Sequence, residues 1–122
     1  MGNMILRGKV VRGLEQGRAL GYPTANLDCG SGELPEPGVY AARTACAGVV
    51  HASVAIIGAR EAGDRPLVEV LLLNFDGDLY GQELTVEVLE KISGIEKFKN
   101  NEALFKKIKE DVQKTREFFS AH

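Results

Sequence analysis

Short apolar segments separated by turn residues dominate the first three quarters of the chain. These segments are Met4–Val11, Val39–Thr44, Gly48–Ile57, Pro66–Phe75 and Glu83–Ile92. Between them lie Gly-Ser-Gly at 30–32, the stretch from Pro35 to Gly38, and Asp76-Gly77-Asp78. Short strands with such regular turns are typical of an antiparallel sheet, sandwich or barrel. The pattern therefore predicts a mainly β fold.

The most apolar of these segments runs from Val68 to Leu73 and continues into Asp76-Gly77. Asp-Gly supplies the residue with positive φ that tight hairpins need, so we expect a central strand that enters a hairpin here. The strand that follows, Leu84 to Leu89, alternates apolar and polar residues only loosely. We expect it to be half-buried.

The last part of the chain is rich in lysine and glutamate and has a helical period. Leu104, Ile108 and Val112 repeat at i, i+4 and i+8, Phe105 lies beside them, and lysines occupy the other face. Asn100 or Asn101 is a suitable N-cap. The pattern predicts one amphipathic helix from Asn101 to Phe119 that packs on the β structure. A helix that binds a partner protein is the alternative.

Composition narrows the function classes. The 122 residues carry 15 Lys and Arg against 17 Asp and Glu, so there is no net basic field for nucleic acid or an anionic membrane. No apolar run is long enough for a signal peptide or a bilayer span. We therefore expect a cytoplasmic protein, with a monomer as the default. With two histidines, His51 and His122, and two cysteines without C-x-x-C spacing, zinc catalysis is not expected and the thiols should be reduced.

Four glycines, at 8, 13, 17 and 21, lie close to Arg12 and Arg18. Glycines let backbone N–H groups approach a phosphate, and Arg18 would supply charge. The spacing matches neither the P-loop pattern nor the dinucleotide fingerprint. Phosphate binding and ordinary turns between strands both remain open from these glycines alone.

The segment Pro23-Thr24-Ala25-Asn26 is more specific. Proline fixes the local backbone, and in an extended chain Thr24 and Asn26 point to the same side because they are two residues apart. A hydroxyl and an amide oxygen are hard ligands suited to Mg²⁺ that carries phosphates. A turn in which both side chains only satisfy backbone groups is the alternative.

Glu69 is the only charged residue between Leu67 and Leu73. A carboxylate in a buried strand is costly, and desolvation should raise its pKa toward a value useful to a general base. An outward or edge-facing position would remove that argument.

Together these motifs resemble the ATP-dependent riboflavin kinase family. The resemblance rests on G-x-V-x-x-G from Gly8, G-R-x-L-G-Y-P-T-A-N from Gly17, Gly-Val-Tyr at 38–40, Asp76 to Gly81, and Glu96-Lys97-Phe98. It implies a six-stranded antiparallel Greek-key barrel with a C-terminal helix. It also implies a single kinase domain over 1–122, with the barrel and its site loops in 1–99 and the helix in 100–119. Family members occur alone or as the kinase part of bifunctional FAD synthetases.

The resemblance also implies an activity, transfer of the γ-phosphoryl group of ATP to the 5′-hydroxyl of riboflavin to give FMN. Thr24 and Asn26 match positions that bind Mg²⁺ and the ATP phosphates, and Gly13 and Arg18 match the loop that covers them. By the same resemblance, Tyr80 would lie beside the nucleotide, Glu69 would act as the catalytic base and Phe98 would contact the flavin.

The chain departs from the family pattern at three places. Leu71 stands where the family usually has histidine, Ser93 where it has arginine, and residues 59–65 replace a family loop. Leu71 and Ser93 favour an alternative, a non-catalytic flavin- or nucleotide-binding regulatory barrel. An oligonucleotide-binding barrel is a third interpretation, which the acidic charge balance and the absence of tryptophan disfavour.

Overall fold

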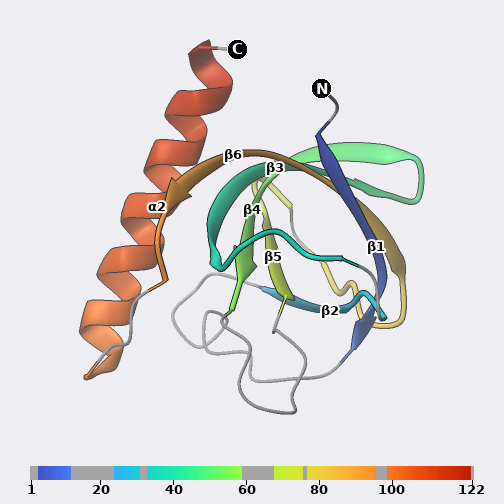
Figure 1. Ribbon diagram of the computed structural model, residues 1–122, viewed down its shortest axis with the longest axis horizontal. Coiled ribbons are helices and arrows are strands. Elements are labelled where there is room, and N and C mark those ends of the chain that lie inside the picture. Colours follow the sequence, from blue (N-terminus) through green and yellow to red (C-terminus); the bar gives the residue numbers. More distant parts are fainter. Residues whose placement is uncertain are drawn as a thin grey trace.

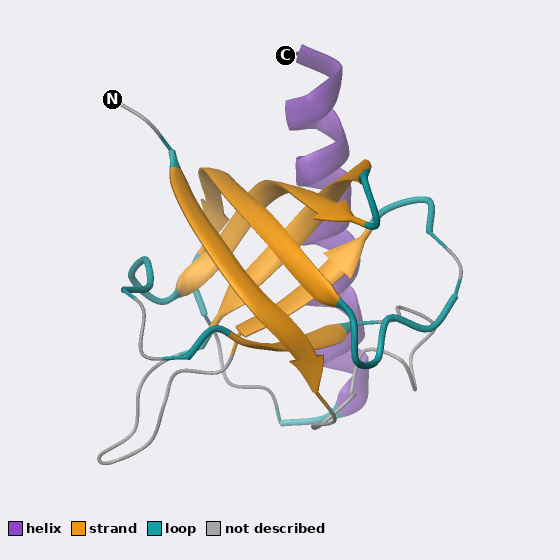
Figure 2. Cartoon of the chain, turned by 90° about the vertical axis from the view of Figure 1, so that its right-hand side faces the viewer, coloured by secondary structure: helices purple, strands orange, loops and turns teal. Residues whose placement is uncertain are grey.

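The computed structural model describes residues 3–11, 24–30, 33–58, 68–75, 77–95 and 99–121. The strands are β1 (Met4–Val11), β2 (Ala25–Asp28), β3 (Gly38–Cys46), β4 (Val49–Ile57), β5 (Val68–Leu72) and β6 (Glu83–Ser93), and the helix is α2 (Asn101–Ala121). The strands pair antiparallel in the order β1-β2-β5-β4-β3-β6, and β6 returns to β1 to close a barrel (Figures 1 and 2). The predicted six-stranded barrel with a C-terminal helix is confirmed.

The alternation of side chains in each strand divides the barrel into an inner and an outer face. In β6, Leu84, Val86 and Val88 are buried inside, with Thr85 and Glu87 between them on the outside. Residues of all six strands contribute to this interior, among them Leu6, Leu27, Ala42, Ala55 and Val70. The interior is therefore filled by side chains, so a substrate site has to lie on the outer face or at a barrel end.

Strands β3 and β4 form a hairpin that the sequence analysis did not identify. Cys46 pairs with Val49 across a two-residue turn, in which Ala47 and Gly48 have φ of 50° and 82°. Positive φ at both positions is characteristic of the type I′ turns that suit twisted hairpins. Alanine is unusual at such a position, which explains why the turn was missed.

The hairpin predicted at Asp76-Gly77 is wrong. Strand β5 pairs with β2 and β4, whereas β6 pairs with β1 and β3, so β5 and β6 are not neighbours. The chain does turn here, since Asn74, Gly77 and Gly81 have positive φ. It then meets β1, where the Gly81 N–H donates to the Val10 carbonyl at 3.0 Å and the Val10 N–H donates to the Gln82 carbonyl at 2.9 Å. The turn residues thus reverse the chain without pairing the strands on either side.

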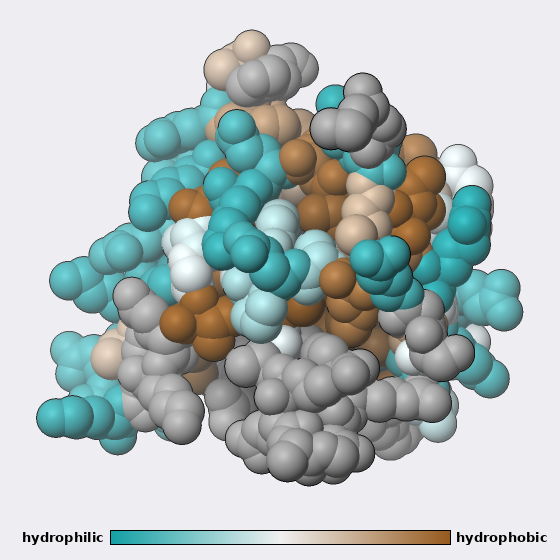
Figure 3. Space-filling model, viewed as in Figure 1, coloured by the Kyte–Doolittle hydropathy of each residue, from teal (hydrophilic) through white to brown (hydrophobic). Residues whose placement is uncertain are grey.

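Helix α2 packs on the outer side of the barrel, against β3, β4 and β6. Val112 and Ile108 contact an outer apolar cluster formed by Val39, Val54, Ala52, Ile56, Leu71 and Leu73. The helix begins where it was expected, because the Asn100 carboxamide oxygen accepts a hydrogen bond from the Ala103 N–H at 2.8 Å. The face of α2 turned away from the barrel is hydrophilic (Figure 3). The apolar stripe of the helix therefore covers the barrel of its own chain.

A membrane span is not found among the helices that the structure describes, since none is both long and apolar enough for one.

Cys29 and Cys46 form no disulfide. The Cys46 S–H donates to the Gln82 side-chain oxygen at 2.9 Å.

Candidate active site

Two candidate residues lie opposite each other on neighbouring strands. In the pairing of β2 with β5, Asn26 is the direct partner of Glu69, and Ala25 is the partner of Val70. Ala25 and Val70 belong to the barrel interior, so Asn26 and Glu69 both project from the outer face. Residues directly opposite in an antiparallel pair have Cβ atoms about 5 Å apart. Residues more than forty positions apart in the sequence are thus brought together.

Thr24 and Asn26 are buried polar side chains without partners. They are 7% and 3% exposed. The Thr24 hydroxyl and both polar atoms of the Asn26 carboxamide have no hydrogen-bond partner among the residues that the structure describes. Leaving a buried polar group unpaired costs about 1–3 kcal/mol. Such groups are available to a ligand, and among the described residues no backbone partner of the kind that the alternative turn requires is found.

The same atoms fit a hard cation. A hydroxyl oxygen and an amide oxygen two residues apart are ligands that Mg²⁺ accepts when phosphates and waters complete its shell. Within the described part of the chain, no group of three or more His, Cys, Asp or Glu is arranged to hold a metal ion. A cation here would therefore depend on neutral oxygen ligands and on the phosphates that it carries.

Glu69 lies in a half-buried position on the outer face of β5. Its other cross-strand neighbour is Ile56 of β4, which packs against the outer apolar cluster. Burial raises the pKa of the Glu69 carboxyl above its ordinary value, because the charged form loses hydration. Among the described residues no hydrogen bond or ion pair to Glu69 offsets that loss. A half-buried, unpaired carboxylate is suited to accept a proton.

A pocket at one end of the barrel adjoins Thr24. It is open to solvent and is lined by Val10, Val11, Thr24, Ala25, Leu72, Phe75, Gly77, Asp78, Leu79 and Tyr80. The Asp78 carboxylate accepts a hydrogen bond from the Tyr80 N–H at 2.9 Å, and the Tyr80 side chain is 51% exposed. Two residues predicted to meet the nucleotide, Thr24 and Tyr80, thus share one pocket. Asn26 and Glu69 do not line it, although Asn26 is only two residues from Thr24.

The other predicted site residues, Gly13, Arg18 and Phe98, lie outside the described residues, as do residues 59–65. Gly8 has a structural explanation: a Cβ atom there would lie 2.4 Å from the Asp28 carbonyl oxygen, so the close contact of β1 with β2 requires glycine. Gly8 therefore needs no role in phosphate binding.

Both described departures from the family pattern have local partners. Leu71 is 3% exposed and belongs to the outer apolar cluster under α2. The Ser93 hydroxyl donates to an Asp111 carboxylate oxygen at 2.8 Å and accepts from the Lys107 ammonium group at 2.6 Å. The sequence analysis missed this contact because Asp111 and Lys107 have the spacing of a solvent-exposed helical pair.

Known proteins resemble this chain in sequence and in fold. The family described as "Flavokinase: Riboflavin kinase" matches residues 2–119. The bifunctional riboflavin kinase/FMN adenylyltransferase of Escherichia coli K12 is 38% identical over 117 residues, which cover 93% of this chain and 37% of that protein. The chain therefore spans less than two fifths of the length of this relative.

Two solved structures have the same fold. A riboflavin kinase from Trypanosoma brucei superposes with a TM-score of 0.64 and 27% identity, covering 98% of this chain and 82% of its own. A Streptococcus pneumoniae structure named a macrolide-efflux protein superposes with a TM-score of 0.86 and 32% identity, covering 93% of this chain and 38% of its own.

Proposed function

This chain belongs to the riboflavin kinase family, and we propose that it transfers the γ-phosphoryl group of ATP to the 5′-hydroxyl of riboflavin to give FMN. The observation that carries the proposal is the pairing of Asn26 with Glu69 on the outer face of the barrel. It sets a buried, unpartnered amide, suited to a metal–phosphate group, beside a carboxylate suited to accept a proton.

In this proposal Thr24 and Asn26 hold Mg²⁺ together with the phosphates of ATP. Their unpaired oxygens support this role, because a bound cation would satisfy them. Mg²⁺ would neutralise the charge that develops on the β- and γ-phosphate oxygens during transfer. The pocket that Thr24 shares with Tyr80 is a suitable place for another part of the nucleotide. Gly13 and Arg18 would cover the phosphates, and Phe98 would line the flavin slot.

Glu69 would act as the general base. Its carboxylate would accept the proton of the riboflavin 5′-hydroxyl as that oxygen attacks the γ-phosphorus in line with the bond to ADP. Its raised pKa supports this role, since a base is most effective when its pKa approaches the working pH. Asn26 beside it would place the phosphate close to the attacking oxygen.

The proposal covers the kinase reaction alone, because the matched family description names only that activity. It includes a single kinase domain over 1–122, a cytoplasmic location and a monomer. The alternative, a regulatory barrel that binds flavin or nucleotide without turnover, depends on Leu71 and Ser93. Both residues have packing or hydrogen-bonding roles, so they do not favour it.

The decisive experiment incubates the purified protein with riboflavin, ATP and Mg²⁺ and separates FMN from riboflavin by chromatography. We expect FMN to form only when all three are present, and to form much more slowly with Glu69→Gln. Binding of riboflavin and ATP without any FMN would support the regulatory barrel instead.

A further inference from the structure

A single cross-strand row connects the candidate site to the end of β6. Ser93 pairs with Val39, Val39 with Ile56, Ile56 with Glu69, and Glu69 with Asn26. Directly paired residues project from the same face of a sheet, here the outer face. Three strand spacings separate Ser93 from Glu69, roughly 14 Å along the sheet. The two residues between them, Val39 and Ile56, both contact the outer apolar cluster under α2.

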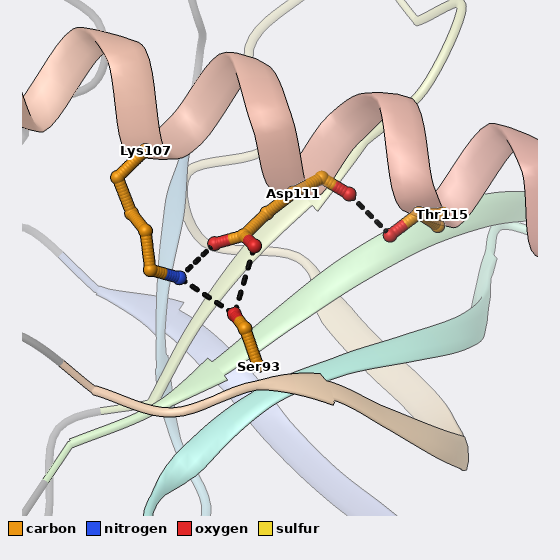
Figure 4. Close-up of polar contacts among 4 residues, drawn as sticks. All are labelled: Ser93, Lys107, Asp111 and Thr115. Carbon is orange, nitrogen blue, oxygen red and sulfur yellow. Dashed lines mark hydrogen bonds and ion pairs between the residues drawn. The ribbon is translucent and has the colours of Figure 1, made fainter.

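At its far end the row meets a buried polar cluster on α2. The Ser93 hydroxyl contacts both ions of the Lys107–Asp111 pair: it donates to Asp111 and accepts from Lys107 (Figure 4). The Lys107 and Asp111 side chains are 14% and 7% exposed. The Thr115 hydroxyl also lies on this face, but it donates to the Asp111 backbone carbonyl of its own helix at 2.8 Å. Within this cluster, Ser93 is the member that belongs to the barrel.

The contacts of Ser93 with Lys107 and Asp111 determine where the helix lies on the barrel more than they add to the stability of the fold. Lys107 and Asp111 are one turn apart on α2, so their ion pair persists wherever the helix lies on the barrel. Buried ion pairs add little net stability, whereas an incorrectly placed one is costly. Sliding the helix by one turn, about 5.4 Å, would put Lys107 or Thr115 opposite Ser93. It would remove the hydrogen bond that the Ser93 hydroxyl donates to the Asp111 carboxylate.

The position of α2 matters to Glu69 through the outer apolar cluster. Val112 of the helix belongs to the same apolar cluster as Leu71, which is two residues from Glu69 on the same face of β5, and Ile108 packs against this cluster. Ile56, the cross-strand neighbour of Glu69, packs against the cluster too. The helix and Glu69 are therefore linked through one apolar cluster, on the side of Glu69 away from Asn26.

From this geometry we infer that Ser93 is a positioning residue, whose hydroxyl fixes α2 against the end of β6 and thereby holds in place the outer apolar cluster beside Glu69. The consequence for catalysis rests on the proposed function, since the role of Glu69 as base is part of it. The consequence for the position of α2 does not.

The test compares Ser93→Ala with two matched variants. Ser93→Ala removes both hydrogen bonds but changes no charge, so any change in hydrogen exchange or turnover reports the lost contact between β6 and α2. Ser93→Thr keeps a hydroxyl and should restore wild-type behaviour. Thr115→Val removes a buried hydroxyl from the same face of α2 whose hydrogen bond stays within the helix, and it serves as the control.

We expect two results for Ser93→Ala. Amide hydrogen exchange of residues 101–121 becomes faster. In the FMN assay kcat falls by about tenfold or more, as is usual when a reacting group is misplaced, while the KM for ATP stays within about twofold.

The possible failures are distinguishable. If the wild-type protein makes no FMN, the kinase proposal fails, but the hydrogen exchange still decides whether Ser93 fixes α2. The inference is overturned if Ser93→Ala leaves the exchange of residues 101–121 at its wild-type value, or if Thr115→Val changes it as much.

Discussion

Replacing Glu69 by glutamine should make the protein more stable at neutral pH and less active. The carboxyl is half-buried and its pKa is raised by loss of hydration, so the folded state binds this proton more tightly than the unfolded state. Stability contributed by this group is complete below the unfolded pKa and is lost as pH rises through the folded pKa. Glutamine has nearly the size of glutamate and remains uncharged at every pH. The variant therefore does not lose this stability as pH rises.

The expected size follows from the same linkage. Every tenfold rise in proton affinity on folding corresponds to about 1.4 kcal/mol at pH values above both pKa values. For a chain of this size, 1 kcal/mol moves the Tm by roughly 4 °C. The variant should therefore unfold at a higher temperature than wild type at pH 8, and the difference should disappear near pH 4. Turnover should fall by about 10²–10⁴-fold, the range for losing a general base.

The assay pairs thermal unfolding between pH 4 and pH 8 with FMN formation at saturating substrates. A Glu69→Gln variant that is less stable than wild type at pH 8 would mean that the carboxylate is a structural ion-pair partner. Turnover within about threefold of wild type, with chemistry shown to be rate-limiting, would refute the base assignment. In the wild type, kcat/KM should decrease as pH falls through the raised pKa of Glu69, because protonation removes the base.

Asn26→Ala should weaken MgATP binding, measured by calorimetry, far more than riboflavin binding, without lowering the Tm of the free protein, because its amide has no described partner to lose; equal loss of both ligands would indicate a structural role. Gly8→Ala should destabilise the fold by about 1–3 kcal/mol in urea unfolding, since the new Cβ would lie 2.4 Å from the Asp28 carbonyl oxygen. Gly94→Ala is its control, with nothing within 4 Å of the added atom, and an equal loss there would contradict the argument. Ala47→Asn should raise stability by about 0.5 kcal/mol in the same assay, because asparagine tolerates the φ of 50° better, and a loss would show that Ala47 has another role.

The local features of the fold could be predicted from sequence, and the partners of its strands could not. The period of Leu104, Ile108 and Val112 correctly gave the C-terminal helix. The turn chemistry of Asp76-Gly77 suggested a hairpin that is absent, because a turn motif reverses the chain without determining which strands then pair. The partners depend on how the whole barrel closes.

The candidate site divides in the same way. That Thr24 and Asn26 share one side of an extended segment is a prediction from a period of two. In the structure both side chains are buried, with Asn26 in β2 and Thr24 just before it. The pairing of Asn26 with Glu69 depends on the register of distant strands, which no local pattern gives. The buried Asp111 was missed for another reason: helical patterns assign charged residues to solvent, whereas this one is neutralised by Lys107 and Ser93.

The pairing of β2 with β5 also has a consequence for the folding kinetics. β2 has four residues and pairs with β1 and with β5. Asn26 of β2 and its partner Glu69 of β5 are more than forty positions apart along the chain. Contacts between such distant segments form late, because the entropy of closing the intervening loop is lost before the contact is gained. A partly folded chain with only the β3–β4 hairpin and α2 in place would therefore lack the candidate site. Ligands of the native centre should slow unfolding more than they accelerate folding.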